Sequence, residues 1–353
     1  MYLFIAILMF SFLIFIHEFG HFITAKLFDV RVNEFSIFMG PRLLHWGKGE
    51  TEYSLRLFPV GGYCAMEGED GDSDDPRAFT KKPGWQRVII LAAGAFMNFV
   101  TGIVILLCLF ATVSGFRTLE ITGFVDGCPL ESEDGFMVGD VLKEIDGDPL
   151  YIFADFSMLT ERSGEGEHEV TVLRNGEKVR LTLDLTKRDY VIDGETEHIY
   201  GLLLGGSEEM TPWVGIRTAA LTAVDFVRMV RLGLVDLISG AAGLDDMSGP
   251  VGIVNTIQET GKSSATVGDG IQNVIYFCAF IAINLAVMNM LPLPALDGGH
   301  IFLLIVTGII EKITRKKVNP KYEAWIHGAG LALLLLLMAV VTFNDIAKLI
   351  IGG

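Results

Sequence analysis

The sequence predicts a polytopic α-helical membrane protein with four transmembrane helices, a membrane-associated β loop after the first helix, and an inserted extracytoplasmic domain of α+β type. Three observations lead to this fold class. Of the 353 residues, 51% are hydrophobic, and they gather in a few blocks with little charge. Four of these blocks are long enough to cross about 30 Å of hydrocarbon, which takes about 20 helical residues. Segments between the blocks alternate apolar and polar residues, as strands do.

The four expected spans cover residues 1–27, 87–114, 271–310 and 324–350. The first lacks the positive n-region and the A-x-A cleavage site of a signal peptide, so we expect it to be retained. The third combines an apolar block with a shorter apolar stretch that cannot span alone. Pro292, Pro294 and the Gly298-Gly299 pair lie between these two parts and predict a break in the helix.

Basic residues predict the orientation of the spans. Five lie in the loop 311–323, namely Lys312, Arg315, Lys316, Lys317 and Lys321. Lys81 and Lys82 lie near the end of the loop 28–86, and Arg87 follows it directly. By the positive-inside rule both loops are cytoplasmic, which places both termini and the segment between the second and third spans outside. From Phe116 to Pro212 that outer segment holds 22 Asp and Glu against 8 Lys and Arg. Such an acidic segment argues against nucleic acid as a partner.

Two regions outside the spans are expected to be rich in strands. In the loop 28–86, EFSIFMG and TEYSLRLFPVGGY alternate like the strands of a small sheet. In the outer region 115–206, Asn175-Gly176 predicts a hairpin, and GFMVGDVLKEIDGDPL resembles the signature of a PDZ domain. PDZ domains bind an extended peptide along a strand edge; an ordinary β-rich domain without a ligand is the alternative. An amphipathic helix in 207–270 is expected either on the outer membrane surface or against this domain.

The motif His17-Glu18-Phe19-Gly20-His21 in the first span carries the strongest chemical signal. Residues four apart on a helix face the same way, so both imidazoles can reach one metal ion. Glu18 lies beside them and can take a proton from a water on that metal. Zinc suits two imidazoles and a carboxylate with one position open for water. Ionisable residues at membrane depth are costly and usually functional, which favours this over a polar packing cluster or a proton path.

A third ligand is expected from another span. The third span contains Asn289-Met290-Leu291-Pro292-Leu293-Pro294-Ala295-Leu296-Asp297-Gly298-Gly299, and Asp297 is the only acidic residue between Ile271 and Ile310. The topology places Asp297 near the cytoplasmic end of its span, at the depth of His17 and His21. The alternative is that Asp297 caps the helix that follows it.

These two motifs resemble the site-2 protease family of intramembrane metalloproteases. With a single extracytoplasmic PDZ-like domain, the chain resembles the bacterial branch of this family, whose members regulate sigma-factor signalling. The resemblance covers nearly the whole chain and implies a zinc metalloendopeptidase of the bacterial inner membrane. It implies that His17, His21 and Asp297 hold one Zn²⁺ and that Glu18 is the catalytic glutamate.

The resemblance also implies what the enzyme acts on. Its substrates would be single-span membrane proteins or peptides, such as anti-sigma factors already trimmed by an earlier protease and remnant signal peptides. The residues that match substrate-binding positions are Asn284, Asn289, Pro292 and Pro294. One departure lies in the second span, where the family has Ala-Gly-Pro and this chain has Ala93-Gly94-Ala95.

Three other classes of function fit parts of the sequence. A membrane scaffold would use only the PDZ-like domain, but a scaffold needs no base such as Glu18. A proton or ion transporter would relay protons through the same four residues, but transporters usually show internal repeats, and these four spans show none. A soluble-type protease merely tethered to the membrane requires the HEFGH helix to lie outside the bilayer, which its apolar flanks oppose.

His45, His168, His198 and His327 are expected to have no special role, and His300 is either a neighbour of the metal ligands or a polar residue at a helix start.

Overall fold

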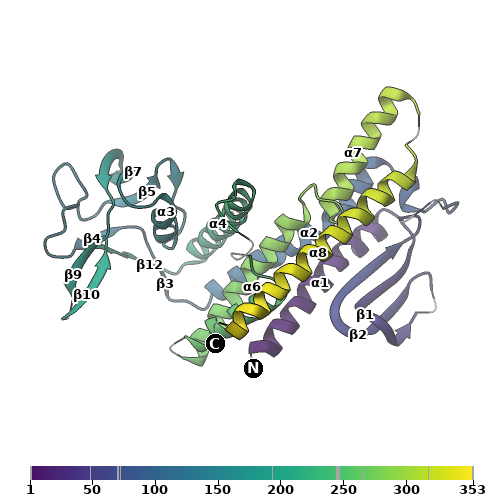
Figure 1. The fold of residues 1–353 in the computed structure, drawn as a ribbon, viewed down its shortest axis with the longest axis horizontal. Helices are drawn as coiled ribbons and strands as arrows, with labels where there is room; N and C mark the ends of the chain where they lie inside the picture. Colours follow the sequence, from purple (N-terminus) through teal and green to yellow (C-terminus); the bar gives the residue numbers. More distant parts are fainter. Residues whose placement is uncertain are drawn as a thin grey trace. The chain divides into compact units, whose positions relative to one another are not determined.

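The computed structural model describes residues 2–47, 49–69, 71, 73–192, 194–243, 247–264, 266–316 and 318–351. Among the residues named above, Lys317 of the basic loop lies outside this range. The chain divides into two compact units, which Figure 1 shows as ribbons. Unit 1 combines Met1–Leu106 with Phe226–Gly353, and unit 2 is Leu107–Asp225.

Helices make up most of unit 1. The long helices of the chain are α1 Tyr2–Leu27, α2 Gly84–Phe110, α4 Pro212–Ser239, α5 Pro250–Lys262, α6 Val267–Asn289, α7 Asp297–Thr314 and α8 Pro320–Ile351, with a short 3₁₀ turn at Phe79–Lys81. The last residues of α2 and the first half of α4 belong to unit 2. Four helices in the described part of the chain are long and apolar enough to span a membrane: Phe4–Leu27, Gly84–Phe110, Val267–Asn289 and Lys321–Lys348. The predicted number of spans is therefore confirmed, and α1 begins at the same end of unit 1 at which α8 finishes (Figure 1).

The third predicted span consists of two helices. α6 ends at Asn289, an irregular turn follows, and α7 begins at Asp297. Pro292 and Pro294 explain the interruption, because a proline ring clashes with the preceding helical turn and offers no N–H. Asp297 is the first residue of α7, and the N-cap position is Leu296, so Asp297 is not the cap.

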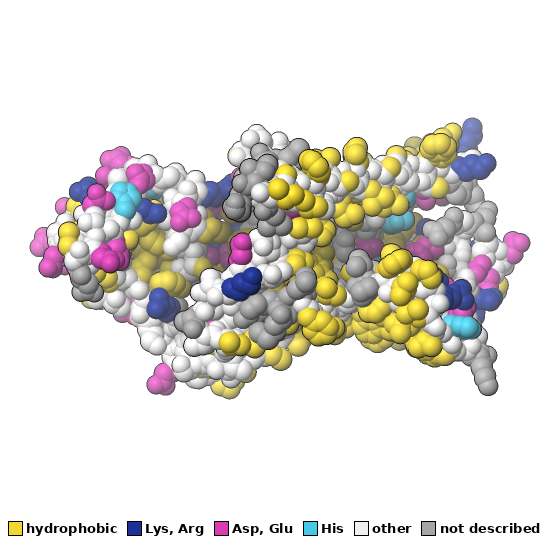
Figure 2. Space-filling view, turned by 60° about the horizontal axis from the view of Figure 1, so that its bottom comes forward, with side chains coloured by type: hydrophobic (Ala, Val, Ile, Leu, Met, Phe, Trp, Pro, Cys, Tyr) yellow, Lys and Arg dark blue, Asp and Glu magenta, His cyan; other side chains and the backbone are white. Residues whose placement is uncertain are grey.

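The surface of α8 is apolar and largely uncovered. Only 6% of its most hydrophobic window is buried, and Leu333 and Phe343 are 67% and 74% exposed. Figure 2 shows apolar side chains gathered along the helical unit, whereas acidic and basic side chains gather on the β-rich unit and at the helix ends. A patch of this extent on a helix needs a partner such as lipid, which agrees with a membrane protein.

Close packing between α1 and its neighbours determines where its polar residues point. Ala6, Met9 and Leu13 pack against α5 and α6 in one buried cluster. Further along α1, Gly20 lies so close to α2 that an added Cβ would collide with the carbonyl of Ala93. The absence of a side chain at Gly20 therefore allows the second half of α1 to approach the α2 backbone.

A curled hairpin lies beside α1, as expected from the alternating pattern. β1 (Val32–Trp46) and β2 (Glu52–Met66) pair antiparallel, and both strands bend, so that Phe35 lies opposite both Cys64 and Tyr53. Phe35 and Cys64 are buried in one cluster with residues of α1 and α2. This packing attaches the hairpin to the half of α1 that carries the HEFGH motif.

An ion pair inside the hairpin predicts a dependence on pH. Burial raises the pKa of Glu34, but hydrogen bonds from Ser54, Tyr63 and Arg56 outweigh it and lower that pKa to about 2. A carboxylate with a lowered pKa in the folded state stabilises the fold above its unfolded pKa, about 4.3, and this contribution is lost as the pH falls toward 2. We expect hydrogen exchange in 32–66, corrected for its intrinsic rate, to accelerate across this window. Glu34→Gln should remove the dependence, and an unchanged pH profile in that variant would contradict the assignment.

Unit 2 is rich in β-strands. Its elements are β3 Gly115–Arg117, β4 Ile121–Phe124, β5 Val141–Ile145, β6 Asp148–Pro149, α3 Asp155–Ser163, β7 Glu167–Arg174, β8 Glu177–Asp184, β9 Arg188–Ile192, β10 Glu195–Ile199, β11 Leu202–Leu204 and β12 Ser207–Glu209. Four strands form a sheet in the order β6-β5-β7-β8, and two-stranded sheets join β4 to β11 and β3 to β12. The predicted hairpin is confirmed, because Asn175 and Gly176 connect β7 to β8 with φ of 51° and 87°.

Candidate active site

Helical spacing brings two imidazoles of α1 together. His17 and His21 lie one turn apart, and their Nε2 atoms are 3.2 Å from each other. The rings are nearly perpendicular, at 82°, so both Nε2 atoms point toward one place. The His21 side chain is almost fully buried, with 9% exposed, and that of His17 is 12% exposed.

The turn between α6 and α7 brings a carboxylate to the same place. Asp297 Oδ2 lies 3.1 Å from His17 Nε2 and 3.5 Å from His21 Nε2. The structure thus brings together residues that are 276 or more positions apart in the sequence. Among the described residues, these three form the one group of His, Cys, Asp and Glu whose ligand atoms lie within 4.8 Å of one another.

This geometry fits a zinc ion. Ligands about 2.0–2.1 Å from a tetrahedral zinc lie about 3.3 Å from each other, and the three measured separations are 3.1, 3.2 and 3.5 Å. Asp297 Oδ2 is buried without a hydrogen-bond partner, which is costly unless a cation satisfies it. Space for an ion is kept by Gly94 of α2, where an added Cβ would collide with His21 Nε2 and come within 2.8 Å of His17 Nε2.

The outer nitrogens of both imidazoles contact α2. His21 Nδ1 lies 2.8 Å from the carbonyl oxygen of Ile90 and donates its proton there, which leaves Nε2 free to bind a metal. The amides of Asn98 and Asn289 lie 3.4 and 3.5 Å from His17 Nδ1. Asn98 is 1% exposed and its Oδ1 has no partner. Rotation of that amide by 180° would let Oδ1 accept the Nδ1 proton that His17 must carry when its Nε2 binds a metal.

Glu18 lies close to both the ligand group and the hairpin. Its carboxyl group interacts electrostatically with His21, His17 and Asp297 and lies near the backbone of Cys64 in β2, and an added Cβ on Gly62 would touch its side chain. Glu18 is therefore adjacent to the ligand group without belonging to it. This is the arrangement that a general base requires beside a metal site.

The remaining residues that were predicted lie around this group. Asn289 is the last residue of α6 and lies near His17, while Pro292 and Pro294 form the turn that leads to Asp297. In the described part of the chain, no hydrogen bond joins Asn284 to the ligand group. Ala95, which replaces the proline of the family pattern, lies within the uninterrupted helix α2.

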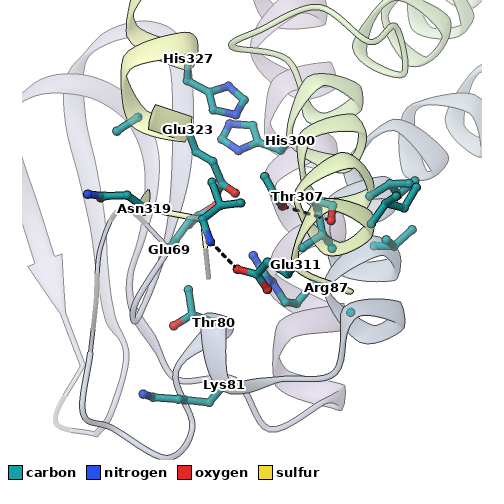
Figure 3. Close-up of a pocket in the computed structure, with 18 of the residues that line it drawn as sticks. Glu69, Thr80, Lys81, Arg87, His300, Thr307, Glu311, Asn319, Glu323 and His327 are labelled. Carbon is teal, nitrogen blue, oxygen red and sulfur yellow. Dashed lines mark hydrogen bonds between the residues drawn. The ribbon is translucent and has the colours of Figure 1, made fainter. Parts of the chain in front are cut away.

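Sequence reasoning missed Asn98, the close approach at Gly94, and His327. Asn98 is a polar residue inside an apolar span, and this position could have been singled out from the sequence. His327 was expected to have no special role, yet its ring stacks on that of His300 with 3.6 Å between centroids, as Figure 3 shows. Both histidines line a cavity of about 1210 Å³ whose polar wall includes Arg87, Glu311 and Glu323.

A helix with H-E-x-x-H and an aspartate from another helix, inside a bundle with four apolar spans, define a metalloprotease of membrane type. The chain belongs to peptidase family M50, whose sequence model matches residues 5–337. It is a membrane zinc metalloprotease.

Relatives align along the whole chain. A candidate zinc metalloprotease of Clostridium perfringens, CPE1693, is 35% identical over 347 residues, which are 98% of each chain. Another of Synechocystis, slr1821, is 33% identical over 352 residues, covering 96% of this chain and 92% of that one. The regulator of sigma-W protease RasP of Bacillus subtilis is 29% identical over 429 aligned positions, covering 97% of each.

Proposed function

We propose that this protein hydrolyses peptide bonds within the transmembrane segments of other proteins. The observation that carries the proposal is the position of the ligand group. His17 and His21 lie in the apolar segment Phe4–Leu27, and Asp297 reaches them from the turn between α6 and α7. A site at that depth meets substrates in the bilayer, where ionisable groups are rare unless they act.

We infer that His17, His21 and Asp297 hold the zinc and that Glu18 is the catalytic base. A zinc ion held there would polarise the carbonyl of the bound peptide and acidify a water molecule. Glu18 takes the proton of the attacking water and then gives it to the amine of the leaving fragment. Ile90 holds His21 in the tautomer that leaves Nε2 free, and Asn98 does the same for His17 once its amide is rotated so that Oδ1 faces Nδ1.

Substrate binding follows from the hairpin and the interrupted helix. A helical substrate hides its peptide bonds in internal hydrogen bonds, so it must unwind before cleavage. The segment 62–66 of β2 passes beside Glu18, and an unwound substrate can pair with it by strand addition. Asn284 and Asn289 of α6 and the prolines of the next turn bind or orient the unwound segment. Polar residues such as Arg87, Glu311 and Glu323 line the cavity at the end of α7 and provide a route for water.

The orientation and the substrate class complete the proposal. By the positive-inside rule, the basic residues of the loop 311–323 favour a cytoplasmic position for this loop in the bacterial inner membrane, with both termini and unit 2 outside. Unit 2 acts as a PDZ-like domain, which the Gly139-Asp140 turn before β5 and the helix α3 support. It excludes substrates with bulky outer domains, so anti-sigma factors trimmed by another protease and remnant signal peptides fit best. One relative is named a regulator of sigma-W protease.

The test uses purified full-length protein in liposomes with a single-span peptide whose outer domain is short. We expect zinc-dependent cleavage, and mass spectrometry should place the cut within the apolar segment. The same span with a large folded outer domain should be cleaved much more slowly. Cleavage only in the flanking polar residues, at equal rates for both substrates, would contradict intramembrane proteolysis.

A further inference from the structure

The turn that leads to Asp297 has an unusual backbone conformation. Ala295, two residues before Asp297, has a φ of 74°, in the left-handed region that residues other than glycine rarely adopt. Gly298 and Gly299, which follow Asp297, lie so close to the carbonyls of the turn that an added Cβ on either would collide with them. A conformation of this kind persists only when surrounding contacts hold it.

α8 supplies such a contact through His327. The backbone N–H of Ala295 donates a hydrogen bond to His327 Nδ1 at 3.1 Å. The flat face of the same ring stacks on His300, with centroids 3.6 Å apart and an interplanar angle of 11° (Figure 3). One side chain of α8 therefore contacts the chain two residues before Asp297 and three residues after it.

A second feature of α8 lies one helical turn further along. Gly330 packs directly on Pro294, where an added Cβ would collide with the proline ring and come within 3.1 Å of its carbonyl carbon. Most of α8 is uncovered, with 6% of its hydrophobic window buried. α8 also contacts α5, where Asp345 accepts hydrogen bonds from the backbone N–H groups of Gly249 and Gly252. The contacts at His327 and Gly330 are separate from that attachment, and they meet the turn that carries Asp297.

We propose that His327 is a positioning residue, which holds the turn of Ala295 so that the Asp297 carboxylate meets His17 and His21. This inference rests on the proposed function, in which Asp297 binds the zinc. It assigns to the fourth span, which carries neither chemical motif, a part in building the metal site. The Nδ1 atom acts as the acceptor, the ring face supports His300, and Gly330 allows α8 to come close enough for both contacts.

The test compares His327→Phe, which keeps a flat ring for His300 but offers no acceptor, with His327→Asn, whose Oδ1 can accept in place of Nδ1. Zinc affinity is measured by competition with a chelator on the full-length protein in detergent, together with kcat and KM for a single-span peptide. Loss of a residue that orients a metal ligand typically weakens metal affinity or activity by about 10- to 100-fold. We expect a loss of this size in His327→Phe, with KM nearly unchanged and most of the affinity regained in His327→Asn.

Two further variants separate the possible outcomes. Gly330→Ala should weaken zinc binding in the same way, because its methyl group displaces Pro294, whereas Leu333→Ala on the exposed face of α8 should not. If Asp297→Ala loses zinc but His327→Phe and Gly330→Ala keep wild-type affinity and kcat, the positioning role is wrong and the proposed function stands. A lower melting temperature in His327→Phe with unchanged zinc affinity would also overturn it. If Asp297→Ala itself retains zinc, the ligand assignment fails, and this inference fails with it.

Discussion

Replacing Glu18 by glutamine is expected to abolish most proteolysis while leaving the zinc in place. In the proposed mechanism the Glu18 carboxylate receives and returns the proton, and the amide of glutamine cannot do either. General acid–base catalysis typically contributes about 10²- to 10⁴-fold to a rate, so we expect kcat to fall by that factor. The measurement is the cleavage rate of a single-span peptide in liposomes, with zinc content determined on the same sample.

Zinc content separates this role from that of a ligand. Glu18 lies outside the group formed by His17, His21 and Asp297, so Glu18→Gln should bind zinc normally. Glu177→Gln, at the exposed start of β8 in unit 2, is the matched control and should cleave at the wild-type rate. Cleavage by Glu18→Gln within threefold of wild type would remove Glu18 from the mechanism.

Replacing Asp297 by alanine is expected to remove the zinc itself. Its Oδ2 lies 3.1 and 3.5 Å from the two imidazole nitrogens, and without it only two protein ligands remain. Loss of a residue that only orients a metal ligand weakens metal binding by about 10- to 100-fold. Loss of a direct ligand should therefore lower the zinc affinity by more than about 100-fold. Metal analysis of the purified protein should show near-stoichiometric zinc in the wild type and only traces in the variant.

A steric variant tests the same site without removing a ligand. Gly94→Ala places a methyl group against His21 Nε2 and His17 Nε2, so it should also release zinc. Gly308→Ala is the matched control, because nothing lies within 4 Å of the added methyl on α7. Normal zinc content in both Asp297→Ala and Gly94→Ala would mean that the ion binds elsewhere.

Several features could be predicted from the sequence because their causes are local. The four-residue spacing of His17 and His21 places them on one helix face whatever surrounds the helix. Pro292 and Pro294 interrupt α6 for reasons contained in the proline ring. Asn175-Gly176 provides two residues that tolerate positive φ, and β7 and β8 form the hairpin that this pair predicts. The uncharged blocks are long enough to span a bilayer by composition alone.

Other features depend on packing between segments that are distant in the sequence. The position of Asn98 inside an apolar span signals that this residue has a role, but not that its amide meets His17, 81 positions away. Nothing near His327 indicates that its ring receives the N–H of Ala295, because an isolated histidine has the same local pattern whether or not it meets a partner. The sequence by itself predicted the four long apolar helices, the strands and the residues proposed as metal ligands. The tertiary structure decided which helix backbones approach at Gly20, Gly94 and Gly330, because such contacts depend on the shape of two surfaces at once.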